Sequence, residues 1–129
     1  MRSIQNEEDF ALVLSQKHAV LYFYVAWSTY AVQGRRMLEE LESLATQDSK
    51  ISFWFADVGD LEAPAAFLEG WLRQQEQPSL KMINVIASGS GSVAWLQSGV
   101  IMDFIQSAMQ HNLEELHNRT VIAFHEGAT

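Results

Sequence analysis

The fold of this chain is decided by the stretch Val20-Leu21-Tyr22-Phe23-Tyr24-Val25-Ala26-Trp27-Ser28-Thr29-Tyr30-Ala31. Seven or eight apolar or aromatic residues follow one another without a break, which predicts a strand buried on both faces of a sheet. Ser28 and Thr29 end the run and can cap a helix that extends to about Thr46, since their hydroxyl groups accept from orphan backbone amides. Many α/β proteins place their chemistry where a central strand leads into a helix N-terminus in this way.

The composition favours one globular domain over residues 1–129, with 48% hydrophobic residues and no internal repeat. A formal net charge of -8 argues against a nucleic-acid partner, which requires clustered Lys and Arg. The polar, acidic first residues and the lack of any long apolar run predict neither a signal peptide nor a membrane span. The chain has no cysteine, which excludes disulfides, thiolate chemistry and Cys-bound metal and makes the cytoplasm the expected location.

The hydrophobic pattern predicts the remaining elements. In chain order they are a helix capped by Asn6, the strand from Val20, the helix 28–46, a strand 51–58, a helix 62–73 with Pro64 in its first turn, strands 80–86 and 93–96 joined by a Ser88–Ser92 hairpin turn, and a helix from about Val100. The apolar residues 121–124 receive no assignment. This order predicts an α/β fold with a mixed sheet of four to five strands and helices on both faces.

Three motifs, in order, carry a family resemblance. Val25–Ala31 stands at a strand–helix corner, Phe53–Asp60 ends a strand in an acidic turn, and Gln77-Pro78-Ser79 precedes an apolar strand. These motifs are similar to the Trp-Cys-x-x-Cys corner, the acidic strand end and the cis-proline segment of the thioredoxin family, which the chain resembles over about residues 4 to 117. The resemblance implies a thioredoxin-like fold, with Trp27 and Pro78 at the matching positions.

The departures from that family bear on activity. Ser28 and Ala31 stand where the two cysteines belong, and Tyr22 stands where the family buries an aspartate. Thiol–disulfide exchange needs one thiolate to attack and a second thiol to resolve the mixed disulfide. A serine hydroxyl and an alanine methyl group supply neither, so we expect no oxidoreductase activity and no enzyme.

Other side chains that could carry chemistry have simpler roles. Ser28 is expected to cap a helix rather than to act as a nucleophile, because no histidine lies near it in the sequence. The acids Asp57 and Asp60 are expected to cap the next helix rather than to bind magnesium. Core packing is expected for Trp54, Trp71 and Trp95, and surface positions without metal are expected for His18, His111, His117 and His125. Whether Trp27 and Tyr30 pack into the corner or form a docking surface stays open.

The resulting hypothesis is a redox-inactive protein that binds a protein or peptide partner, as a chaperone or adaptor. Its groove would lie between Trp27, Ser28, Thr29, Tyr30 and Ala31 on one side and Gln77, Pro78 and Ser79 on the other. By the resemblance, the backbone before the cis proline would add a strand of the partner. The alternative is a binding site for glutathione or another anion, or a non-redox enzyme, at the helix N-terminus formed by Ser28-Thr29. A self-associating structural domain is a third hypothesis. No cofactor, metal, nucleic acid or membrane is expected.

Overall fold

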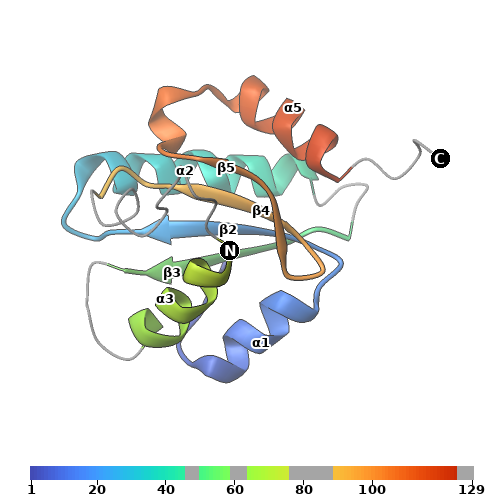
Figure 1. The fold of residues 1–129 in the computed structure, drawn as a ribbon. Coiled ribbons are helices and arrows are strands. Elements are labelled where there is room, and N and C mark those ends of the chain that lie inside the picture. The colour runs from blue at the N-terminus through green and yellow to red at the C-terminus, as the bar shows by residue number, and fades with distance from the viewer. Residues whose placement is uncertain (46–49, 59–63, 76–88, 125–129) are drawn as a thin grey trace.

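The described residues form a five-stranded sheet with helices packed on both of its faces (Figure 1). The computed structural model describes residues 1–45, 50–58, 64–75 and 89–124, with the backbone alone for 64–66. The elements are β1 (Arg2–Ser3), α1 (Glu7–Ser15), β2 (His18–Tyr24), α2 (Thr29–Ala45), β3 (Ser52–Asp57), α3 (Pro64–Gln75), β4 (Val93–Gln97), β5 (Val100–Ile105), the 3-10 helix η1 (Ala108–Gln110) and α5 (Leu113–Ala123).

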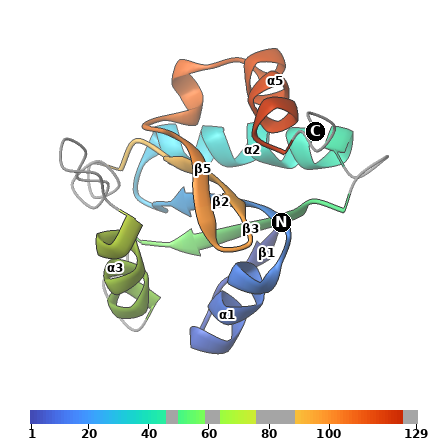
Figure 2. The same cartoon turned by 45° about the vertical axis from the view of Figure 1, so that its right-hand side comes forward.

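Strand β2 is the centre of the sheet, whose strand order is β1-β3-β2-β4-β5. It runs parallel to β3 and antiparallel to β4, so the prediction of a mixed sheet is confirmed. Helices α1 and α3 lie on one face, and α2 and α5 lie on the other (Figures 1 and 2). Because both faces are covered, residues 19–23 of β2 are all buried, as their unbroken apolar run predicts.

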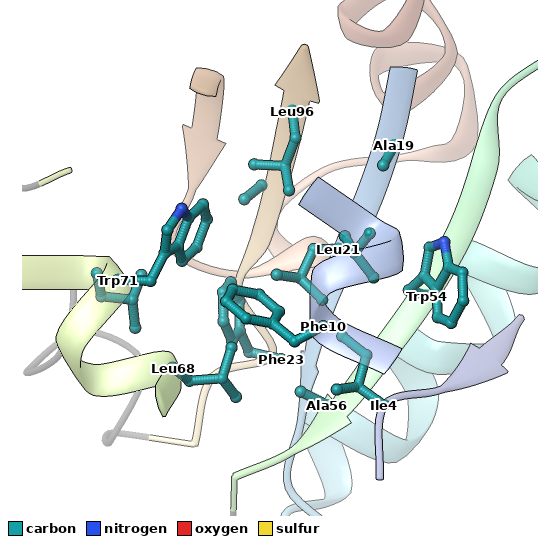
Figure 3. Packing of buried hydrophobic residues seen from close by; sticks show 13 residues of the cluster. Ile4, Phe10, Ala19, Leu21, Phe23, Trp54, Ala56, Leu68, Trp71 and Leu96 are labelled. Carbon is teal, nitrogen blue, oxygen red and sulfur yellow. The ribbon is translucent and has the colours of Figure 1, made fainter. Parts of the chain in front are cut away.

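Alternate residues of β2 enter two separate core clusters. Leu21 and Phe23 point toward α1 and α3, where Phe10 and Trp71 meet edge to face with ring centroids 5.3 Å apart (Figure 3). Val20 and Tyr22 point toward α2 and α5. The predicted core tryptophans are confirmed, because Trp54, Trp71 and Trp95 are all buried.

The N-terminal elements begin where local sequence signals predict. The Asn6 side chain accepts a hydrogen bond from Asp9 N at 2.8 Å and caps α1, whose first turn is acidic. Helix α3 begins at Pro64, which has no amide hydrogen to lose in a first turn. Strand β2 ends at Tyr24, so the last apolar residues of the predicted strand form a turn instead.

The prediction of a helix from about Val100 is wrong, because residues 100–105 form strand β5. Ser98 and Gly99, with φ of 50° and 82°, make a two-residue hairpin turn between β4 and β5. A register shift opposite Trp95 then places Ile101 and Ile105 in different core clusters. Because of this irregularity, buried and exposed residues do not alternate strictly along β5, and the sequence pattern lacks the period of two that indicates a strand.

The predicted Ser88–Ser92 hairpin turn is also wrong. Strand β4 lies between β2 and β5, so it does not pair with a strand that immediately precedes it. The strand expected at 80–86 lies outside the described residues. The final helix, α5, begins after its cap Asn112 and includes the previously unassigned residues 121–123. The short edge strand β1, which pairs with β3, was not predicted from the sequence.

Candidate binding site at the corner between β2 and α2

The corner between β2 and α2 is built around Ser28. Its hydroxyl Oγ accepts a hydrogen bond from Ala31 N at 3.3 Å, and its carbonyl accepts from Val32 N at 3.0 Å. These two bonds satisfy amides of the first helical turn, so the prediction that Ser28 is an N-cap is confirmed. Thr29 is the first residue of α2 and is exposed.

A segment that sequence reasoning missed, residues 89–92, packs against this corner. Ser28 Oγ donates to Gly89 O at 2.6 Å, across 61 positions of the chain. The Trp27 ring lies over Gly89, where a Cβ atom would stand 2.6 Å from the ring carbon Cη2. Gly89 and Gly91 both have φ of +77°, which a side chain disfavours. The two glycines therefore allow the backbone to approach the corner closely, a role that their spacing alone did not reveal.

The carbonyl groups of residues 89–92 are all hydrogen-bonded within the fold. Gly89 O accepts from Ser28 Oγ, Ser90 O from Ser107 Oγ at 2.7 Å, Gly91 O from Ala108 N at 2.9 Å and Ser92 O from Phe23 N at 2.9 Å. The segment is thus fixed from the corner, from β2 and from the start of η1. Each of its four carbonyl groups therefore already accepts a hydrogen bond from another part of the chain.

Tyr22 fills the space beneath the corner. It is 0% exposed, and its hydroxyl donates to Ala31 O at 2.6 Å. Burial, with a smaller contribution from Tyr24, raises the pKa of the Tyr22 phenol far above its ordinary value, and Arg35 opposes the shift. The resemblance places an aspartate here, but a neutral phenol cannot accept a proton as a carboxylate would.

The exposed part of the corner is aromatic and uncharged. Trp27 and Tyr30 are 68% and 66% exposed, whereas Ser28 and Ala31 are 7% and 0% exposed. Both aromatic residues therefore keep most of their surface open to solvent, although the Trp27 ring also contacts Gly89. Trp27 precedes the cap Ser28, Tyr30 lies in the first turn of α2, and Thr29 between them in the sequence is exposed. Gln77, Pro78 and Ser79 lie outside the described residues.

The histidines and acids show no metal arrangement among the residues that the structure describes. His111 Nδ1 lies 3.0 Å from Glu115 Oε2, and His117 is exposed, as expected. His18 is half-buried rather than fully exposed, with its ring stacked on Phe124 at 4.6 Å between centroids. His125 and Asp60 lie outside the described residues. Over the same described part of the chain, no helix has the length and apolar character needed to cross a bilayer.

No protein-family model matches the sequence, and no curated protein matches it either. Solved structures do match. A mutant thioredoxin from Halobacterium salinarum superimposes with a TM-score of 0.67 at 12% identity, covering 97% of this chain and 91% of the other. Plasmodium falciparum thioredoxin superimposes with a TM-score of 0.59 at 15% identity, and the match covers 93% of this chain and 96% of the other. Mitochondrial thioredoxin 3 from Saccharomyces cerevisiae superimposes with a TM-score of 0.61 at 17% identity, and the match covers 93% of this chain and 92% of the other.

These likenesses cover nearly the whole of each chain, although the sequence identities are low. The TM-scores of 0.59 to 0.67 show that the arrangement of the backbone is shared. The protein therefore has the thioredoxin fold, and it has this fold without a cysteine.

Proposed function

We propose that this protein is a redox-inactive binding module, a chaperone or adaptor, which receives a partner protein on the exposed aromatic residues of its β2–α2 corner. The observation that carries the proposal is the exposure of Trp27 and Tyr30, 68% and 66%, three residues apart at the same corner. Large aromatic side chains dominate the energetics of protein interfaces. Neither ring is needed to fill the core, which is packed without them.

The absence of cysteine fits a binding role rather than thiol–disulfide catalysis. Ser28 and Ala31 are buried and support the helix, so contact with a partner falls to Trp27, Thr29 and Tyr30. Because the carbonyl groups of residues 89–92 already accept hydrogen bonds within the fold, we propose recognition by side chains at this segment. Strand addition at Gln77-Pro78-Ser79 stays a prediction, as does the cytoplasmic location.

Affinity capture from an extract of the native source tests the proposal. The wild-type chain is compared with Trp27→Ala/Tyr30→Ala, and Ile122→Ala is the matched control, because Ile122 is 76% exposed on α5. We expect the corner variant to lose at least about ten-fold in partner affinity, which corresponds to ~1.4 kcal/mol. Retention of the same partners by the corner variant would refute the proposal. All variants should keep the wild-type circular dichroism spectrum, since the replaced side chains are exposed.

Two further assays separate binding from the other hypotheses. Insulin reduction with dithiothreitol should proceed at the uncatalysed rate, and acceleration by the protein would contradict redox inactivity. A thermal-shift panel with glutathione and phosphate tests the anion site at Ser28-Thr29. A shift that vanishes when Ser28 is replaced would favour the small-ligand hypothesis over partner binding.

A further inference from the structure

Strand β5 is an edge of the described sheet and has the features of a pairing surface. Among the described residues it pairs with β4 alone, and Val100 and Met102 on it are 54% and 51% exposed. An exposed edge strand offers backbone groups that can pair with a strand from another molecule. Two copies of one edge can pair antiparallel about a two-fold axis, so the occupant that this edge fits is β5 of a second copy.

Two backbone amides of β5 are occupied by side chains. Ile101 N donates to Gln75 Oε1 at 3.3 Å, and Phe104 N donates to Asp103 Oδ1 at 2.9 Å. Amides of an antiparallel strand point alternately toward the partner strand and away from it. Met102 has no partner residue in β4 because of the register shift, so the alternation skips one position and the amides of both Ile101 and Phe104 point away from β4. A second strand arriving at this edge would have to displace both acceptors.

The carboxylate of Asp103 is itself held in place. Arg119 Nη1, on α5, donates to Asp103 Oδ1 at 3.1 Å and to Oδ2 at 2.9 Å. Both side chains of the pair are partly exposed, so two charged groups lie at the sheet edge, where an incoming apolar strand would have to desolvate them. The register shift between β4 and β5 lies at the same place, opposite Trp95. Charged side chains and bulges on an edge strand are two means by which proteins prevent sheet-to-sheet association.

We propose that Asp103, fixed by Arg119, is an edge guard that prevents β5 from pairing with β5 of a second copy. The net charge of -8 opposes association of two copies in general. The guard acts locally, because it occupies the Phe104 amide and places a carboxylate where the incoming backbone would lie. It uses no residue of the β2–α2 corner, so this proposal stands or falls independently of the partner-binding function.

The test is the self-association of Asp103→Ala, measured by sedimentation equilibrium over a concentration series. Glu40→Ala is the matched control, since Glu40 is exposed on α2 and its loss changes the net charge equally. We expect Asp103→Ala to dimerise at least about ten-fold more tightly than wild type and Glu40→Ala to behave as wild type. Hydrogen exchange at the Phe104 amide should slow as the dimer forms, because that amide then pairs between strands.

A rescue variant distinguishes edge pairing from general loss of structure. Adding Met102→Lys to Asp103→Ala places a lysine on the same strand and should restore the wild-type association constant. The proposal is overturned if folded Asp103→Ala associates no more than Glu40→Ala, or if Met102→Lys fails to reverse its association. Should Asp103→Ala not fold, Asp103→Thr takes its place, because it removes the carboxylate, keeps a residue that favours strands and should shift association in the same direction.

Discussion

The packing beneath the corner makes a quantitative prediction for Gly34→Ala in α2. A Cβ atom at Gly34 would collide with the Tyr22 hydroxyl and would lie 3.3 Å from both Tyr22 Cζ and Ala108 Cβ. Tyr22 is fully buried and hydrogen-bonded to Ala31 O, so the phenol has no free space to enter. Overpacking of this kind costs about 1–3 kcal/mol. The intrinsic helix preference of alanine over glycine offsets about 1 kcal/mol of that cost.

Gly70→Ala is the matched control, because Gly70 is also helical but no atom beyond its chain neighbours and the adjacent backbone of its own helix lies within 4 Å of the position of its Cβ. Here only the helix preference acts, and we expect a stabilisation of about 0.5–1 kcal/mol. The two substitutions should therefore differ by about 1–3 kcal/mol in the free energy of unfolding, which is the packing cost at Gly34.

A double-mutant cycle with Tyr22→Phe assigns that cost to the hydroxyl. Tyr22→Phe alone should destabilise by about 1 kcal/mol, because it removes the bond to Ala31 O. Without the hydroxyl, the closest contact of the new methyl group disappears, and the next two, with Tyr22 Cζ and Ala108 Cβ, are at 3.3 Å. Gly34→Ala should then cost less than in the wild type, with a coupling energy of about 1–2 kcal/mol.

Urea unfolding followed by circular dichroism gives all of these free energies, provided that the slope of free energy against urea is the same for every variant. The reasoning is refuted if Gly34→Ala stabilises the protein as much as Gly70→Ala does. It is also refuted if the cycle is additive within about 0.5 kcal/mol, since neighbouring groups that collide must couple.

Two further predictions concern the corner. Ser28→Ala removes the cap to Ala31 N and the bond to Gly89 O and should destabilise by about 1–2 kcal/mol. Thr29 is the exposed neighbour, and Thr29→Ala should change the free energy of unfolding by less than about 0.5 kcal/mol. Equal effects of Ser28→Ala and Thr29→Ala in urea unfolding would contradict the role of Ser28 as the helix cap. Burial raises the pKa of Tyr22 in the folded state, so its contribution to stability is complete below the unfolded pKa of about 10 and falls as the pH rises above that value. The urea midpoint should therefore decline above about pH 10, and Tyr22→Phe should show a smaller decline. Identical dependence of the midpoint on pH in the two proteins would contradict a contribution from Tyr22.

The sequence by itself determined the elements whose signals are local. The unbroken apolar run from Val20 predicts a strand covered on both faces, and residues 19–23 are all buried between two helical layers. Asn6 and Ser28 predict helix starts because a cap acts on amides only two or three residues away. The absence of cysteine excludes thiol chemistry in any fold.

Tertiary structure alone decided which distant segments meet. The β4–β5 hairpin has a register shift that hides its alternation, so residues 100–105 resemble a helix in the sequence and form a strand in the fold. The packing of Gly89 against Ser28 joins positions 61 residues apart, and no spacing rule connects them. The exposure of Trp27 and Tyr30 likewise depends on what the rest of the chain leaves uncovered. Caps and periodic patterns act within a few residues, whereas register, close approach and exposure are set by contacts between elements, which is why they emerged only when the chain was folded.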